Sequence, residues 1–158
     1  ANYAARIQAE AMAIDLYGIL WHTLIFAGTG FQQSHLVEAT TPAVTLRPAF
    51  YAYRNAARQL RGAYYAGPPL SNIRYDEDGK VQLLRFTDSA GAPVYVAWLP
   101  NATEERSFAL LAWPYAHATC ISHLELPTPL ATNCSDTRGD GEIRFKVSDA
   151  PVYVRFGS

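Results

Sequence analysis

The sequence lacks both an excess of charge of one sign and a long apolar run. Its 13 Lys and Arg residues nearly balance its 14 Asp and Glu residues, which gives a formal net charge of −1 at pH 7. A chain with this balance has no basic footprint for a nucleic acid or an anionic membrane surface. It also has no run of about 18 apolar residues, the length that a transmembrane helix needs. We therefore expect neither nucleic acid nor membrane among its partners.

Cysteine is scarce as well, which limits the metal sites and disulfides that the chain can form. The two cysteines, Cys120 and Cys134, are too few for a structural zinc site, and no histidine lies at a matching spacing. We expect no metal, and the lack of a complete Gly-rich phosphate loop predicts no cofactor. If the cysteines pair, they close a loop of about 15 residues, worth roughly 3 kcal/mol in the chain-entropy model. The residues alone leave the paired and the free state open.

Two N-glycosylation sequons begin at Asn101 and Asn133. Glycans of this kind are attached at the surface of secreted proteins, and disulfides persist in the same oxidising compartments. Two sequons and two cysteines also arise by chance in a chain of this size. We expect an extracellular protein that is glycosylated at these asparagines.

Apolar and aromatic side chains are abundant, at 49% and 13% of the residues. This composition is typical of a globular protein that buries a core. The pattern changes at Gly67-Pro68-Pro69, and adjacent Gly and Pro residues often mark a domain boundary. We predict two domains, residues 1–66 and residues 67–158.

The first domain is predicted to begin with a helix and a strand. Residues 2–17 are apolar around most of a helical circumference, and Gly18 is expected to end this helix. Residues 19–26 are apolar on both faces, as in a strand of a buried parallel sheet. A single parallel strand has no neighbours, and each buried unpaired backbone group costs about 1–3 kcal/mol. Its neighbours then come from another polypeptide, from another copy of the chain, or from an edge of the second domain, and the two-sided apolar pattern favours the first.

A loop and a second helix complete the first domain. Residues 27–47 show no period and are expected to form a long loop, a kind that is usually functional. Pro48 stands at a first helical turn and opens the second helix. Its expected inner stripe consists of Phe50, Tyr53, Ala57 and Leu60.

The second domain is predicted to be an antiparallel β-sandwich. Short alternating segments are separated by turn signals, which is typical of this architecture. The expected strands lie near residues 72–75, 81–87, 94–99, 108–113, 118–123, 143–147 and 152–156.

Several motifs occur in an order that is similar to the end of one enzyme family. The motifs are the helix at residues 2–17, the strand at 19–26 with Trp21, GFQ at 30–32, SHLVE at 34–38, RPAFYAYR at 47–54, VYVAW at 94–98, GEI at 141–143 and SDAPVYV at 148–154. Together they resemble the C-terminal part of a clan-A-type glycoside hydrolase, a (β/α)₈ TIM barrel followed by a β-sandwich. The resemblance implies an α/β plus all-β fold, with the last helix–strand–helix of the barrel in residues 1–66.

The resemblance also implies a carbohydrate ligand bound beside the eighth barrel strand. The implied sugar-binding residues are Trp21, His22, Phe31, Gln32, His35 and Glu38. The residues themselves leave simpler interpretations open: a core tryptophan, a buried histidine and a solvent-exposed loop acid. The family's two catalytic carboxylates lie on the fourth and seventh strands, which are absent here. We therefore expect no catalytic residue in this chain, which is a fragment that is inactive unless other chains or copies supply the missing strands.

Two other classes of function stay open. In the first, the chain is a structural or self-assembling module whose apolar strand and helices are buried against other copies in an oligomer. In the second, it is a carbohydrate-binding domain without catalysis.

Overall fold

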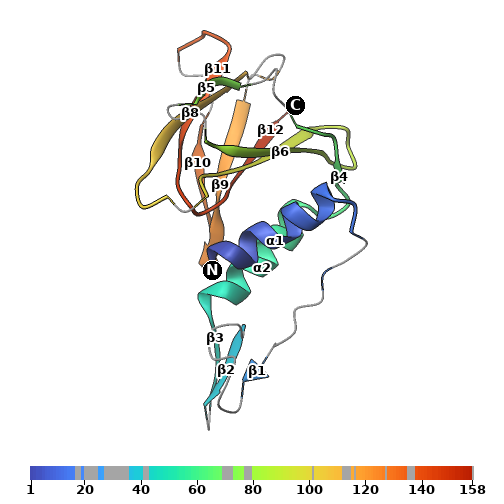
Figure 1. Cartoon of the computed structure of the whole chain (residues 1–158), viewed down its shortest axis with the longest axis vertical. Coiled ribbons are helices and arrows are strands. Elements are labelled where there is room, and N and C mark those ends of the chain that lie inside the picture. Colours follow the sequence, from blue (N-terminus) through green and yellow to red (C-terminus); the bar gives the residue numbers. More distant parts are fainter. Residues whose placement is uncertain are drawn as a thin grey trace.

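The described part of the chain is built in layers (Figure 1). A pair of helices covers one face of a six-stranded sheet, and a three-stranded sheet packs on its other face. The computed structural model describes residues 1–16, 19, 25–26, 36–40, 43–68, 73–76, 80–100, 102–111, 115, 117–126, 128–134 and 138–157. No helix among these residues is long and apolar enough to span a membrane.

Two antiparallel sheets stack as a β-sandwich, as the sequence predicts. The central sheet consists of β4 (Tyr64–Tyr65), β6 (Gln82–Thr87), β7 (Pro93–Trp98), β9 (His117–Leu126), β10 (Thr128–Asn133) and β12 (Val152–Gly157). The outer sheet consists of β5 (Ile73–Asp76), β8 (Arg106–Leu111) and β11 (Glu142–Val147). The strand orders are β10-β9-β12-β7-β6-β4 and β11-β8-β5.

The apolar core of the sandwich lies between the central and outer sheets. Its fully buried members include Phe108 and Leu110 on β8, Ile143 on β11 and Val154 on β12. Phe108 packs edge-on against Phe145 with ring centroids 5.6 Å apart, an arrangement that aromatic pairs prefer. Every residue of β7 is buried, because the outer sheet covers one face of this strand and the helices cover the other.

The two helices lie side by side and run parallel (Figure 1). They are α1 (Asn2–Ala13) and α2 (Pro48–Gln59). Ala5 and Ala52 share one buried cluster, and Ala9 and Ala56 share the next one along the pair. Small side chains let two helices approach closely. Neighbouring parallel helices are typical of α/β units, in which a strand connects one helix to the next.

The helix pair packs on the central sheet through a second apolar cluster. Leu60 follows α2 and packs with Phe86 of β6 and Tyr153 of β12. The hydroxyl of Tyr153 donates a hydrogen bond of 3.0 Å to the backbone carbonyl of Ala5 in α1. Burial raises the pKa of the Tyr153 phenol, because the ionised form would lose its solvation.

Polar side chains fix α2 on the central sheet. Asn55 Nδ2 donates to the backbone carbonyl of Ser122 at 2.8 Å, and Gln59 Nε2 donates to Asn55 Oδ1 at 3.1 Å. The Arg155 guanidinium donates to the Gln59 carbonyl at 2.9 Å and to the Asp88 carboxylate at 2.7 Å. Buried polar groups need such partners, and these bonds set the position of the helix along the sheet.

The predicted inner stripe of α2 is wrong in part. Ala57 is exposed, and Phe50 and Tyr53 are only half-buried, whereas Leu60 is buried as predicted. The buried residues within the helix are Ala52, Asn55, Ala56 and Gln59. Small residues face α1 and amides face β9, so side-chain size and hydrogen bonding decide this face rather than apolar periodicity.

The first helix ends at Ala13, earlier than the sequence predicts. Asp15 has a φ of 60°, the left-handed conformation that often follows a helix C-cap. The Leu16 N–H donates to the carbonyl of Ala11 at 3.0 Å, as in a Schellman motif. Gly18, the residue expected to end the helix, lies outside the described residues.

A small sheet lies at the N-terminal end of α2 (Figure 1). Its strands are β1 (Ile25–Phe26), β2 (Val37–Thr40) and β3 (Ala43–Leu46), in the order β1-β2-β3. The pairing of β1 with β2 is parallel and that of β2 with β3 is antiparallel. The prediction of a loop over residues 27–47 is therefore wrong for β2 and β3, where β-branched residues favour strands. One neighbour of the predicted strand at 19–26 lies in the same chain, an arrangement that the three predicted alternatives leave out.

A disulfide joins Cys120 on β9 to Cys134, directly after β10, with Cα atoms 5.7 Å apart. It ties together the two strands at one edge of the central sheet. The sequence does not predict β10, because Pro129 weakens its strand pattern. Proline is tolerated in an edge strand, and the register shifts between Pro129 and Ala131.

The predicted boundary at residue 67 stays a prediction. The chain crosses from the helices to the central sheet before that point, because β4 already pairs with β6. The Ala66 N–H also donates to the Arg85 carbonyl at 2.8 Å.

Candidate functional site

The candidate site is the end of the small sheet that adjoins the start of α2. Ligands of parallel α/β structures bind at the carboxyl ends of the strands. In the register of the small sheet, Phe26, the last residue of β1, is paired with Glu38. From β3 the chain passes through Arg47 directly into α2. Leu46 at the end of β3 is paired with Val37 at the start of β2, so Glu38, one residue farther along β2, lies close to the start of the helix.

Glu38 and Arg47 form an ion pair at this site. Glu38 Oε2 lies 3.7 Å from Arg47 Nε, and the Glu38 side chain is 47% exposed. The Arg47 N–H donates to the carbonyl of Leu36 at 3.0 Å, which fixes the backbone from which the guanidinium extends. An ion pair with this exposure contributes about 0–1 kcal/mol to stability. Replacing this ion pair by hydrogen bonds from Glu38 or Arg47 to a polar ligand would therefore cost little free energy.

Aromatic side chains continue from this pair along the first turns of α2. The guanidinium carbon of Arg54 lies 5.3 Å from the ring centroid of Tyr51 and 5.7 Å from that of Phe50. The two rings meet edge-on with centroids 5.8 Å apart. Cation–π contacts of this kind stabilise ring positions. The first turns of α2, which follow Arg47, thus carry a charged group and aromatic rings, the two surfaces that a sugar ring contacts through its hydroxyls and its C–H groups.

Only one of the predicted sugar-binding residues lies in the part of the chain that the structure describes. Glu38 is on β2 and faces Arg47. The others stay predictions outside the described residues: Trp21, His22, Phe31, Gln32 and His35.

The predicted glycosylation sites are divided in the same way. Asn101 lies outside the described residues, and Asn133 ends β10, where its backbone is paired with Thr119. Neither asparagine is established as glycosylated.

Arg47 is a site residue that the sequence analysis does not identify. It directly precedes Pro48, the first residue of the helix, so the sequence indicates only a structural role at the helix start. Two short alternations are the signal that could have revealed the hairpin: residues 37–40 read VEAT, and residues 44–47 read VTLR. A hairpin at this place brings Glu38 and Arg47 together across two strands.

No group of three or more His, Cys, Asp or Glu side chains within the described ranges is arranged to hold a metal ion.

The chain is similar in fold to solved glycoside hydrolases. With a family 39 glycoside hydrolase from the gut symbiont Bacteroides cellulosilyticus WH2, the TM-score is 0.72 at 17% identity, over 99% of this chain and 30% of that chain. With the catalytic domain of GH30 xylanase C from Talaromyces cellulolyticus, it is 0.55 at 17% identity, over 79% and 28%. With the GH51 arabinofuranosidase from Xanthomonas axonopodis pv. citri, it is 0.53 at 9% identity, over 78% and 29%. No family model matches the chain, and no curated protein matches its sequence.

These similarities confirm the predicted fold class and the resemblance to clan-A-type glycoside hydrolases at the level of fold. Identities of 9% to 17% are too low to carry more than the fold. The chain spans about 30% of the length of the structures that it matches.

Proposed function

We propose that the chain is a section of a glycoside hydrolase. In this proposal α1, β1 and α2 are the last helix–strand–helix unit of a (β/α)₈ barrel, and the two larger sheets are its accessory β-sandwich. The observation that carries the proposal is the match to a family 39 glycoside hydrolase over 99% of this chain. The parallel helix pair supports it, because a returning strand between parallel helices is the repeating unit of such a barrel.

The catalytic carboxylates belong, in this proposal, to barrel strands outside this chain. Glycosidases use two carboxyl groups, about 5–5.5 Å apart in retaining enzymes and farther apart in inverting ones. The described residues of the small sheet contain a single carboxylate, that of Glu38. Glu38 then binds sugar hydroxyls rather than breaking the glycosidic bond, and Arg47 positions its carboxylate.

The missing barrel strands pair, in this proposal, with the free edge of β1. Among the described strands, β1 pairs with β2 alone, and an unpaired strand edge inside a barrel would be costly. Another chain, another copy or further sequence of the same polypeptide supplies those strands.

Hydrolysis by the whole protein that contains this chain tests the proposal. We expect turnover of 4-nitrophenyl β-D-xylopyranoside or 4-nitrophenyl α-L-arabinofuranoside, the sugars suggested by the xylanase and the arabinofuranosidase among the structural neighbours. Glu38→Gln should lower kcat/KM about tenfold or more, because a hydrogen bond to a charged group contributes about 1.5–3 kcal/mol. Trp21→Ala should raise KM if Trp21 stacks on the sugar.

Glu104→Gln is the matched control. Glu104 pairs with Arg106 at 3.2 Å on the sandwich and is 70% exposed, so its loss should leave kcat/KM unchanged. If Glu38→Gln and Glu104→Gln have the same kcat/KM, Glu38 has no part in sugar binding. If the whole protein hydrolyses neither these glycosides nor other aryl glycosides, the proposed activity is wrong.

A self-assembling module is the second candidate function. Apolar side chains on the first domain are exposed, including Ile14 at 70%, Leu16 at 53% and Val44 at 68%, and such surfaces often mark an interface. Sedimentation of the chain over a range of concentrations distinguishes this function from the glycoside hydrolase proposal. A self-assembling module forms oligomers without any other polypeptide.

An extracellular location is part of the proposal. The disulfide between Cys120 and Cys134 supports it, because such bonds are rare in reducing compartments. Intact-mass analysis of the native protein before and after glycosidase treatment tests whether Asn101 and Asn133 carry glycans.

A further inference from the structure

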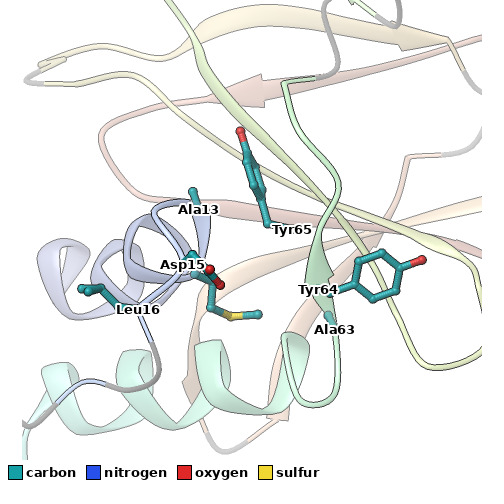
Figure 2. A pocket seen from close by; sticks show the side chains of 7 residues that line it. Ala13, Asp15, Leu16, Ala63, Tyr64 and Tyr65 are labelled. Carbon is teal, nitrogen blue, oxygen red and sulfur yellow. The ribbon is translucent and has the colours of Figure 1, made fainter.

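A cavity lies at the opposite end of the helix pair from the candidate site, between the end of α1 and the start of β4. Its volume is about 420 Å³, and its lining includes Met12, Asp15, Leu16, Ala63 and Tyr65. Figure 2 shows the Asp15 side chain at the end of α1 directed toward the β4 segment, with the Tyr65 ring standing beside Ala13. Ligand pockets of proteins measure roughly 300–1,000 Å³, so this cavity suits a small ligand.

The tyrosine wall of the cavity is held in place by the central sheet. Tyr65 is paired with Phe86 between β4 and β6, and the two rings lie 5.7 Å apart. The neighbouring Tyr64 also lines the cavity, although its ring extends away from α1 (Figure 2). A ring that is fixed before binding costs little conformational entropy when a ligand stacks on it.

Asp15 is less favourable for helix stability than glycine or asparagine would be at its position. The residue has a φ of 60°, which glycine adopts freely and other residues adopt at a cost. Its negative charge also lies at the C-terminal end of α1, where the helix dipole disfavours an acid. Both penalties fall on the one acid that lines the cavity. Stability sacrificed at a single residue is typical of a functional position.

We propose that this cavity is a second carbohydrate-binding site, which takes one neutral sugar residue. The Asp15 carboxylate accepts hydrogen bonds from two adjacent hydroxyls, and the Tyr65 ring and Met12 contact the apolar face of the sugar. The choice of a sugar over another polyhydroxylated ligand rests on the proposed function. The site is separate from the Glu38 site, because the 12 residues of α2 lie between them and span about 18 Å.

Titration of the whole protein with xylotriose, followed by backbone amide NMR shifts, tests the proposal. We expect shifts at Met12–Leu16 and Ala63–Tyr65 that saturate with their own dissociation constant. Asp15→Asn should weaken this binding about tenfold or more, because the hydrogen bonds to a charged acceptor are lost. The same variant should raise Tm, since asparagine is favoured in the left-handed conformation and removes the charge from the helix end.

Asp15→Gly is a matched variant, because glycine adopts the left-handed conformation without steric cost and has no side chain to bind the sugar. It should raise Tm further and abolish the shifts at Met12–Leu16. Three results would overturn the proposal: no xylotriose shifts at this end of the helices, shifts that both variants retain, or a fall of Tm in both variants.

The experiment separates this site from the proposed activity. Shifts at Glu38 without shifts at Asp15 reject the second site and leave the glycosidase proposal standing. Saturable shifts at Asp15 in a protein that hydrolyses no glycoside retain the second site and reject the proposed activity. Glu38→Gln should leave the shifts at Asp15 unchanged.

Discussion

The sandwich and the N-terminal region of helices and small sheet differ in how many of their large apolar side chains are buried among the described residues. Between the central and outer sheets, Phe108, Leu110 and Ile143 are fully buried by other strands of the same chain. On the small sheet, Val44 is 68% exposed, and near the end of α1 Ile14 is 70% exposed. Both regions contain strands and large apolar residues, yet among the described residues the sandwich buries more of its large apolar side chains than the small sheet does.

This difference indicates which part of the chain supports the other. A closed core supplies most of the free energy of folding, whereas the helices are stabilised mainly by packing on the central sheet, as short helices usually are. The free surface of the first domain is then available for barrel strands or for ligands.

The largest effect should come from opening the core of the sandwich. Phe108→Ala removes a fully buried ring that packs on Phe145, and we expect a loss of about 3–5 kcal/mol in the free energy of unfolding. Urea denaturation followed by tryptophan fluorescence measures it. Val44→Ala on the small sheet is the contrasting change and should cost less than about 0.5 kcal/mol. Equal losses in the two variants would contradict the difference between the regions.

A smaller effect should come from separating the two regions. Arg155 donates to the Gln59 carbonyl at the end of α2 and to the Asp88 carboxylate beside β6. Arg155→Met keeps the length of the side chain but removes these bonds, and we expect a loss of about 1.5–3 kcal/mol. Hydrogen exchange should become faster in the last turn of α2 than in β8.

Arg106→Met is the control for Arg155→Met. Arg106 forms an exposed pair with Glu104 at 3.2 Å, which contributes at most about 1 kcal/mol. If exchange in α2 is equally fast in both variants, Arg155 does not join the helix to the sheet. The stabilities of Asp88→Asn, Arg155→Met and the double variant, each compared with the unchanged protein, give the interaction energy of the pair.

The sequence predicted the sandwich better than the first domain, for a physical reason. Strands such as β7 and β12 pack on residues of the same chain, so their apolar pattern reflects the fold that they adopt. The end of α1 was missed because Asp15 takes the left-handed conformation in place of the expected Gly18. The buried face of α2 was missed because amides such as Asn55 are buried through hydrogen bonds rather than hydrophobicity.

The candidate site was predicted less completely than the fold. Glu38 was recognised from a motif, but Arg47 was not, because their contact depends on a hairpin across which the two residues meet. Asp15 and Tyr65 lie far apart in sequence, and no local pattern indicates that they line one cavity. Contacts between distant segments follow from packing, which periodicity does not encode.

The smallest effect should come from the single hydrogen bond between the sandwich and α1. Tyr153→Phe removes the hydroxyl that donates to the Ala5 carbonyl at 3.0 Å, and we expect a loss of about 1 kcal/mol near pH 7. Burial raises the pKa of Tyr153 in the folded state, so above its unfolded pKa of about 10 only the unfolded state releases the proton. Stability of the native protein should therefore fall as pH rises above about 10. Since the phenylalanine variant lacks this term, the stability difference between the two proteins should shrink at high pH, as urea denaturation at several pH values would measure. If the stability difference between the native protein and Tyr153→Phe stays constant as pH rises, the Tyr153 phenol ionises equally in the folded and unfolded states.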